Sequence, residues 1–209
     1  MSLKAPVIIL ADGPFPVHAR PQALLKSAGT LICCDGAARH LDDLRLVPAA
    51  IVGDMDSLSP ELKARYAGAL VERPDQASGD LEKALVWARD QGAAEVFIIG
   101  AAGGRDDHAF GNVAMLWTDF GLHVVMITDF GSLERVDGRA ELPAFEGQQV
   151  GLFPAGPAVK LTTDGLAYNL GGEPLTAMHR GASNVALDDR ITIEARGGPV
   201  IVFQSHAVP

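Results

Sequence analysis

The spacing of apolar residues changes near residue 130 of this 209-residue chain. Before that point, short β-rich runs alternate with segments whose apolar residues have the spacing of an amphipathic helix. The β-rich runs are Val7–Ala11, Leu31–Cys34, Ala50–Val52, Glu95–Ile99 and His123–Thr128. Strands that alternate with helices need crossover connections, and they form a mostly parallel sheet with helices on its faces. We therefore predict an α/β domain over residues 1–130, with a Rossmann-like sheet and flanking helices.

Two of the intervening segments have a well-defined apolar face, with apolar residues at positions i, i+3, i+4 and i+7. In the first segment these residues are Leu81, Ala84, Leu85 and Ala88. In the second they are Phe110, Val113, Ala114 and Trp117. The spacing predicts two helices that pack through these faces.

Beyond residue 130, turn-forming residues interrupt the chain at short intervals, for example at Asp137-Gly138, Gly171-Gly172 and Gly197-Gly198-Pro199. The stretches between the turns have strand character; they include Gln149–Phe153, Val159–Thr163, Arg190–Glu194 and Val200–Phe203. Short strands separated by turns are typical of an antiparallel sandwich or barrel. We predict an all-β sandwich domain over residues 131–209.

The composition favours a cytoplasmic globular protein. Hydrophobic residues make up 48% of the chain and charged residues 21%, and no apolar run is long enough to span a membrane. A net charge of −9 argues against nucleic acid as a partner, because phosphates would be repelled. The two cysteines, Cys33 and Cys34, are adjacent, so a disulfide between them is not expected and a reducing compartment fits.

Acidic residues beside glycines gather where the predicted parallel strands end. Four segments have this character: residues 34–41, 51–58, 75–85 and 100–112. Ligands of open α/β sheets bind at the carboxyl ends of the strands, so we expect these segments to meet in one site.

Asp54 and Asp56 follow the third predicted strand. With the chain extended, their i, i+2 spacing turns both carboxylates to one side. Mg²⁺ prefers one or two carboxylates together with phosphate oxygens, so the pair suits a magnesium–nucleotide site. The alternative is that Asp56 or Ser57 caps a helix that begins near Pro60.

Asp80 opens the first amphipathic helix, where it is either a cap or a third metal ligand. Gln76, just before it, could hydrogen-bond to an adenine edge or a phosphate. Both residues belong to the same predicted edge of the sheet.

The segment 100–108 connects a predicted strand to a helix. The amides of Gly103 and Gly104 can approach an anion closely, and Arg105 can clamp a phosphate with two hydrogen bonds. The alternative is a glycine-rich turn in which Asp106 or Asp107 caps the helix. The segment matches neither the dinucleotide-binding fingerprint nor the phosphate loop of nucleoside triphosphatases.

Taken together, several carboxylates at the strand ends and an arginine beside them indicate a magnesium–polyphosphate complex. The metal would neutralise the carboxylates, and the positively charged arginine would balance the negative charge of the phosphates. Caps alone would not need this concentration of negative charge.

The ordered motifs resemble those of the thiamine pyrophosphokinases. The resemblance rests on the acidic-glycine stretch at Asp35, on GDMDS at 53–57, on Asp75–Asp80 with LEKAL after it, and on GGRDDH with Asn112 beyond it; in the second half it rests on LTTDGLAYNL at 161–170 and GASN at 181–184. It implies an enzyme that transfers pyrophosphate from ATP to thiamine, giving thiamine diphosphate and AMP. It also implies a homodimer with thiamine bound near the subunit interface.

The resemblance implies roles for particular residues. Mg²⁺ would be held by Asp54, Asp56 and Asp80, and these residues with Arg105 would be catalytic. The ATP-binding residues would be Asp35, Gly36, Gln76, Gly103, Gly104, Arg105, Asp107, His108 and Asn112. Thiamine would contact Ser183 and Asn184.

This chain departs from the family pattern at three places. Gly36-Ala37-Ala38-Arg39 stands where a glycine–alanine–asparagine run is common, Gly79 replaces a threonine, and the last strand has no tryptophan. The altered last strand leaves room for a pyrophosphokinase that acts on another hydroxylated acceptor, such as a hydroxymethylpterin. A separate alternative is a non-catalytic module that senses nucleotide or thiamine, although the retained acidic positions speak against it.

Overall fold

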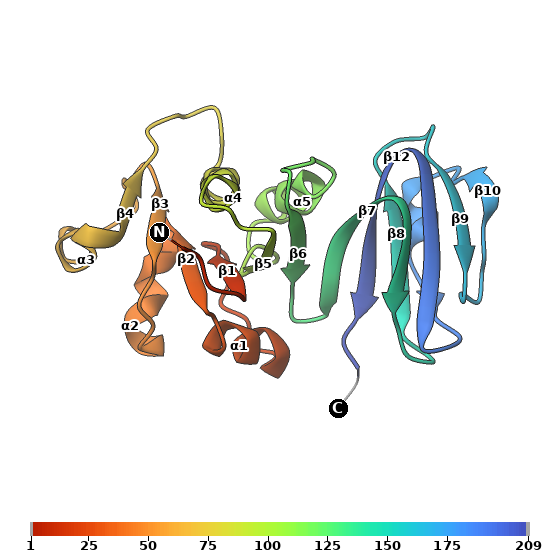
Figure 1. The fold of residues 1–209 in the computed structure, drawn as a ribbon, viewed down its shortest axis with the longest axis horizontal. Helices are drawn as coiled ribbons and strands as arrows, with labels where there is room; N and C mark the ends of the chain where they lie inside the picture. The colour runs from red at the N-terminus through yellow and green to blue at the C-terminus, as the bar shows by residue number, and fades with distance from the viewer. Residues whose placement is uncertain (1, 208–209) are drawn as a thin grey trace. The chain divides into compact units, whose positions relative to one another are not determined.

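The computed structural model describes residues 2–207, and the chain divides into two units (Figure 1). The first unit ends at Asp129 and the second begins at Phe130. Each has its own cluster of buried apolar side chains.

The first unit contains six parallel strands in the spatial order β6-β5-β1-β2-β3-β4. Their bounds are β1 Val7–Leu10, β2 Thr30–Cys34, β3 Ala50–Gly53, β4 Leu70–Glu72, β5 Glu95–Ile99 and β6 His123–Ile127. The five runs predicted as strands are confirmed, and β4 is an addition that the sequence pattern did not reveal. The central strands are continuous apolar runs because both of their faces are buried.

Helices connect these strands: α1 Ala19–Lys26, α2 Leu41–Leu44, α3 Pro60–Arg65, α4 Asp80–Asp90 and α5 Asp106–Met115, with short 3-10 helices η1 Asp35–His40 and η2 Ala67–Ala69. In the view of Figure 1, α4 and α5 lie above the central strands, and α1 and α2 lie below them. Of the described helices, none is both long and apolar enough to cross a membrane.

The two predicted amphipathic helices differ in how far their apolar residues are buried. In α4 the four residues of the predicted face, Leu81 to Ala88, are all buried. In α5 no residue is buried, and Phe110 is 66% exposed. That prediction was wrong in part, because α5 ends at Met115 and the residues that pack into the core, Leu116 and Phe120, follow the helix.

In the second unit, every described strand pairing is antiparallel. The strands are β7 Gly131–Pro143, β8 Gln149–Pro154, β9 Lys160–Asp164, β10 Gly171–Pro174, β11 Asn184–Val185 and β12 Arg190–Ser205, with a 3-10 helix η3 Met178–Gly181 before β11. β12 pairs with β7 along its length, with β9 through its first part and with β8 through its last part.

Two turns predicted in this unit are interruptions within long strands instead. Gly138 lies inside β7, and Gly197 and Gly198 lie inside β12, where the register with β7 shifts between Ala195 and Val200. All three glycines have positive φ, so the paired strands accommodate an irregularity without ending. The segments 190–194 and 200–203 are consequently one strand.

Candidate active site

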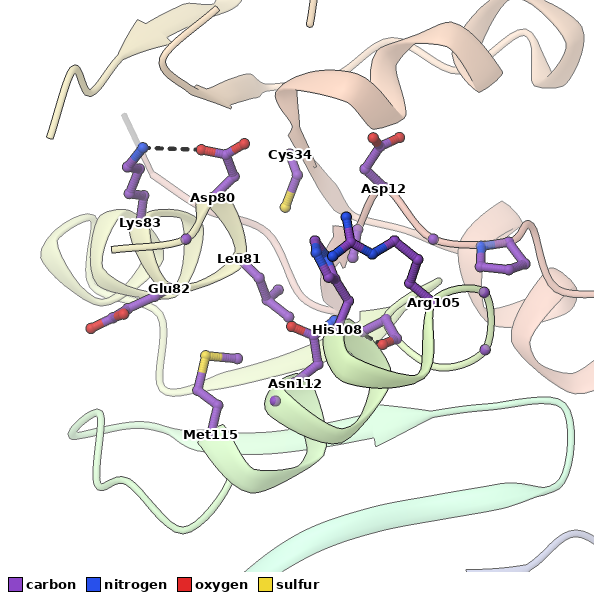
Figure 2. A pocket seen from close by; sticks show the side chains of 18 of the residues that line it. Asp12, Cys34, Asp80, Leu81, Glu82, Lys83, Arg105, His108, Asn112 and Met115 are labelled. Carbon is purple, nitrogen blue, oxygen red and sulfur yellow. Dashed lines mark hydrogen bonds and ion pairs between the residues drawn. The ribbon is translucent and has the colours of Figure 1, made fainter. Parts of the chain in front are cut away.

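A cavity of about 960 Å³ lies in the first unit, at the carboxyl ends of β1, β2, β3 and β5 (Figure 2). The starts of α4 and α5 line it as well. Of the residues predicted from sequence, the cavity brings together Asp54, Gln76, Asp80, Gly103, Gly104, Arg105, His108 and Asn112. The other predicted residues of this half lie within two residues of a lining residue in the sequence but are not part of the lining: Asp35, Gly36, Asp56 and Asp107.

Three carboxylates converge beside this cavity. Ligand oxygens of Asp35, Asp54 and Asp56 all lie within 4.8 Å of one another. The predicted metal set contained Asp80 in place of Asp35. In the structure, Oδ1 of Asp80 accepts a hydrogen bond from Nζ of Lys83 at 3.1 Å, and Asp80 lies close enough for its charge to act on Asp35.

Asp35 has the surroundings of a cation ligand. Its side chain is 2% exposed, and no hydrogen-bond partner among residues 2–207 reaches Oδ2. Burial, followed by the negative charges of Asp80 and Asp54, raises the pKa of this carboxyl to about 6. A buried carboxylate oxygen without a partner is costly, and a cation would offset that cost. The donor set of three carboxylates therefore fits Mg²⁺.

The turn between Asp54 and Asp56 brings the two carboxylates together in a way that the sequence did not predict. The chain is not extended here, because Met55 has a φ of 68°, in the left-handed region. The backbone N–H of Asp56 donates to Oδ1 of Asp54 at 3.2 Å. The capping alternative is wrong, since Ser59 caps α3 by accepting from the N–H of Leu62.

Gln76 contacts the acidic cluster directly. Its amide nitrogen donates to Oδ2 of Asp54 at 3.0 Å, and this bond contributes to lowering the pKa of Asp54 after the larger effect of the Asp56 backbone N–H. In this structure Gln76 therefore orients a carboxylate of the cluster.

Two glycines leave room for carboxylates at the strand ends. A Cβ on Gly53 would lie 2.8 Å from Cβ of Asp35, and a Cβ on Gly36 would collide with the carboxylate of Asp12. These close approaches explain why glycine stands beside aspartate at the ends of β2 and β3.

The loop after β5 has the backbone of an anion-binding segment. Gly103 and Gly104 have φ of 84° and 73°, conformations that favour glycine, and the N-terminus of α5 follows. Arg105 is the N-cap residue, so the alternative with Asp106 or Asp107 as the cap is wrong; both lie in the first turn. Figure 2 shows Arg105 and His108 directed toward the cavity.

Asp107 and Asn112 form hydrogen bonds that stabilise this loop. Asp107 accepts two hydrogen bonds from the Arg105 guanidinium, at 3.1 and 2.7 Å, and this interaction lowers the pKa of Asp107 to about 2. Nδ2 of Asn112 donates to the carbonyl of Ala101 at 2.8 Å and ties α5 to the loop. Both residues thus position the segment that carries Arg105.

The sequence matches two family models in order. Residues 21–126 match "Thiamin pyrophosphokinase, catalytic domain", and residues 136–200 match "Thiamin pyrophosphokinase, vitamin B1 binding domain". The chain belongs to the thiamine pyrophosphokinase family. The expected activity, ATP-dependent transfer of pyrophosphate to thiamine, is thereby confirmed as that of the family.

Individual members of the family agree with this assignment. Thiamine pyrophosphokinase 1 of Oryza sativa subsp. japonica is 30% identical over 197 residues, which cover 78% of this chain and 74% of the relative. Thiamine pyrophosphokinase 1 of Arabidopsis thaliana is 28% identical, with coverages of 82% and 76%. The crystal structure of thiamine pyrophosphokinase from Bacillus subtilis has the same fold, with a TM-score of 0.80 at 22% identity over 97% of this chain and 99% of that one.

The predicted thiamine-binding residues of this thiamine pyrophosphokinase family member lie in the second unit. Ser183 has a φ of 66° and is exposed, whereas Asn184 is 9% exposed. Oδ1 of Asn184 accepts from the N–H groups of Tyr168 and Val185, and Nδ2 donates to the carbonyl of Tyr168 at 2.8 Å. Asn184 therefore fixes the loop that presents Tyr168, whose side chain is 73% exposed.

Four charged residues of the cavity were not among the predicted site residues: Asp12, Arg39, Glu82 and Lys83. Asp12 follows β1 and precedes a glycine, the same pattern that identified the other strand ends, so the sequence did carry a signal for it. Lys83 lies three residues after Asp80, one helical turn away, and is 7% exposed. For Arg39 the sequence offered only its departure from the family pattern.

Proposed function

We propose that this chain binds Mg–ATP in the cavity of the first unit and transfers the β,γ-pyrophosphoryl group to the hydroxyl of thiamine. The observation that carries the proposal is the meeting, at one edge of the parallel strands, of a three-carboxylate cluster with a glycine loop and its arginine. A carboxylate cluster alone would suit many cations. An anion-binding loop at the same cavity suits a metal–polyphosphate complex.

The carboxylates of Asp35, Asp54 and Asp56 would hold Mg²⁺, with Asp80 at the border of the cluster. When bound, the ion would neutralise phosphate oxygens and so favour nucleophilic attack at phosphorus. Gln76 keeps the Asp54 carboxylate oriented through its 3.0 Å hydrogen bond.

The protein's own contribution to the transfer is positioning and charge. The amides of Gly103 and Gly104 and the Arg105 guanidinium bind phosphate oxygens, and Asp107 holds Arg105 in place. The hydroxyl oxygen of thiamine forms a bond to the β-phosphorus while the bond from that phosphorus to the α,β-bridging oxygen breaks. AMP leaves, and the hydroxyl proton passes to a carboxylate. We assign this role to Asp80, because it lines the cavity close enough to Asp35 for their charges to interact and yet is not one of the three clustered carboxylates.

The finer architecture is also part of the proposal. Residues 1–130 form a Rossmann-like ATP- and magnesium-binding domain, and residues 131–209 form a β-sandwich that binds thiamine through the region of Ser183 and Asn184. The order of the two family models supports this division. The proposal includes the homodimer that the resemblance to the family implies, which sedimentation velocity would test. The two free, buried cysteines support a cytoplasmic location, which localisation of a tagged chain would test.

The experiment is to incubate the purified protein with Mg–ATP, with and without thiamine, and to quantify AMP and thiamine diphosphate in the same samples. We expect equal amounts of both products, formed only with thiamine and abolished by a chelator. AMP that forms only with another hydroxylated acceptor would leave the ATP site intact and refute thiamine as the substrate.

A further inference from the structure

Arg39 is a second arginine of the cavity, and its surroundings differ from those of Arg105. It lies in the last turn of η1, four residues after Asp35, and its side chain is 49% exposed. Arg105 is held by Asp107, a neighbour in its own helix turn, whereas Arg39 is ion-paired with Asp12, which comes from the loop after β1. Arg39, which lines the cavity after β2, is thus oriented by Asp12, which follows β1.

The contacts of Arg39 fix one end of the guanidinium and leave the other available. Nη1 donates to the carboxylate of Asp12 and to the carbonyl of Gly36 at 2.9 Å. Nη2 makes only a long contact of 3.5 Å with the Asp12 carbonyl, and Nε donates to no residue in the part of the chain that the structure describes. Because Gly36 has no Cβ, the Asp12 carboxylate fits against it, where it pairs with Arg39.

The topology brings Arg39 close to the anion-binding loop. β1 lies between β2 and β5 in the strand order, so the segment after β1 separates η1 from the glycine loop. That segment is joined to the glycine loop by hydrogen bonds from Ala11 to Ile99 at 2.8 Å and from Gly13 to Gly100 at 2.9 Å. Arg39 therefore belongs to the element that begins at Asp35 of the acidic cluster, and its ion pair with Asp12 links it to the segment that adjoins the loop carrying Arg105.

Charge decides which part of a ligand Arg39 can bind. The cavity is lined by four carboxylates, Asp12, Asp54, Asp80 and Glu82, and by three cations, Arg39, Lys83 and Arg105. Thiamine carries a positive charge and would be repelled by a guanidinium, and adenine is neutral. The phosphate chain is the anionic part of the substrates, and a planar guanidinium with unused N–H donors matches its oxygens.

We propose that Arg39 binds the polyphosphate of the nucleotide alongside Arg105, and that Asp12 is the positioning residue that aims it. The inference rests on the proposed function, because it takes the cavity to be the ATP site. It adds a phosphate-binding residue that neither the motifs nor the family comparison had assigned.

The competing explanation is that the ion pair only ties the β1 loop to η1. In that case removal of either partner would have the same effect. If Arg39 binds phosphate, removal of Arg39 and removal of the Asp12 charge must differ, because the guanidinium survives in the second variant.

The test measures the Kd of Mg–ATP by calorimetry, together with the KM of each substrate, for wild type, Arg39→Ala, Arg39→Gln and Asp12→Asn. Arg39→Ala and Arg39→Gln should weaken Mg–ATP binding about 10- to 100-fold, the range of lost charge-assisted hydrogen bonds, and should leave the KM of thiamine unchanged. Asp12→Asn should weaken Mg–ATP binding clearly less than Arg39→Ala does, because asparagine still accepts from Nη1 but holds the guanidinium without a charge. Arg89→Ala removes a similarly exposed pair, with Asp90 on the end of α4 outside the cavity, and should change nothing.

Two results would overturn the inference and leave the proposed function standing. One is wild-type affinity for Mg–ATP in folded Arg39→Ala or Arg39→Gln protein. The other is a loss of affinity for Mg–ATP in Asp12→Asn as large as that in Arg39→Ala, which would show that the ion pair only connects the β1 loop to η1. A wild-type protein that neither binds Mg–ATP nor forms AMP would instead refute the proposed function itself.

Discussion

At the scale of single residues, the buried carboxyl of Asp35 links the stability of the chain to its chemistry. Asp80 and Asp54 lie near it, and burial with these charges raises its pKa from 3.8 to about 6. The folded protein thus binds this proton more tightly than the unfolded chain does. The resulting stabilisation is fully present below about pH 4 and is lost as the pH rises through 6.

Asp35→Asn should therefore melt at a higher temperature than wild type above pH 6 in the presence of chelator, because asparagine resembles the protonated carboxyl in carrying no charge. The difference should shrink toward pH 4. Added Mg²⁺ should raise the melting temperature of wild type and have less effect on the variant. Equal differences between the two proteins at pH 4 and pH 8 would contradict the account of Asp35.

Asp54→Asn and Asp56→Asn should each reduce turnover at least about 100-fold, because each removes a charge from the proposed metal site. Both side chains are exposed enough to tolerate the change, so the melting temperature should stay near that of wild type. Asp90→Asn, an exposed carboxylate of α4 away from the cavity, is the matched control and should keep full activity. Near-normal rates in either cluster variant would refute the metal assignment.

At the scale of elements, the strand ends could be predicted better than the details of the turns that follow them. The β-rich runs and the aspartate–glycine pairs were sufficient to bring Asp54, Asp80 and Arg105 to one edge. The left-handed conformation of Met55 was not predictable, because methionine has no preference for it. The inclusion of Asp35 in the cluster depends on the close approach of β2 and β3 at Gly53, a distance that no spacing along the chain encodes.

In the second unit, glycines were interpreted as turns although they lie within paired strands. Gly138 pairs with Ala195 across the β7–β12 pair, beside the register shift that contains Gly197 and Gly198. A positive-φ glycine is compatible with either a turn or a bulge, and only the pairing partner decides between them. The sequence alone could not supply that partner.

Gly53→Ala should displace Asp35, since the new Cβ would lie 2.8 Å from Cβ and 2.9 Å from Cγ of that residue. We expect a loss of stability of about 1–3 kcal/mol by overpacking and a loss of activity of at least about tenfold, measured by thermal denaturation and by AMP release. Gly68→Ala is the control, because a Cβ there meets no atom within 4 Å. Wild-type stability and rate in Gly53→Ala would show that β2 and β3 leave room for a side chain at position 53.

Asn184→Ala should release the Tyr168 loop, because three hydrogen bonds to backbone groups are lost. The KM of thiamine should rise while the KM of ATP stays unchanged, with a stability loss of about 1–3 kcal/mol. Gln148→Ala provides the comparison: this side chain is also buried and hydrogen-bonded in the second unit, and its loss should lower stability without changing either KM. A proportional rise in both KM values for Asn184→Ala would contradict a role in the thiamine site.

At the scale of the whole molecule, the pattern change near residue 130 coincides with the step from parallel to antiparallel pairing. The sequence could predict this change because hydrophobic period and turn density differ between the two halves. It could not indicate the behaviour of α5, whose apolar residue Phe110 follows helical spacing and yet is 66% exposed. Periodicity identifies an apolar face, but it does not identify what covers that face.

The central claim concerns the whole chain: the pyrophosphoryl group moves as one unit from ATP to thiamine. ATP labelled differently on its α- and γ-phosphorus tests this most directly, with products separated after partial turnover. We predict that the α-label appears only in AMP and the γ-label only in thiamine diphosphate, in equal amounts. γ-label in orthophosphate, or release of ADP with thiamine monophosphate, would contradict the account.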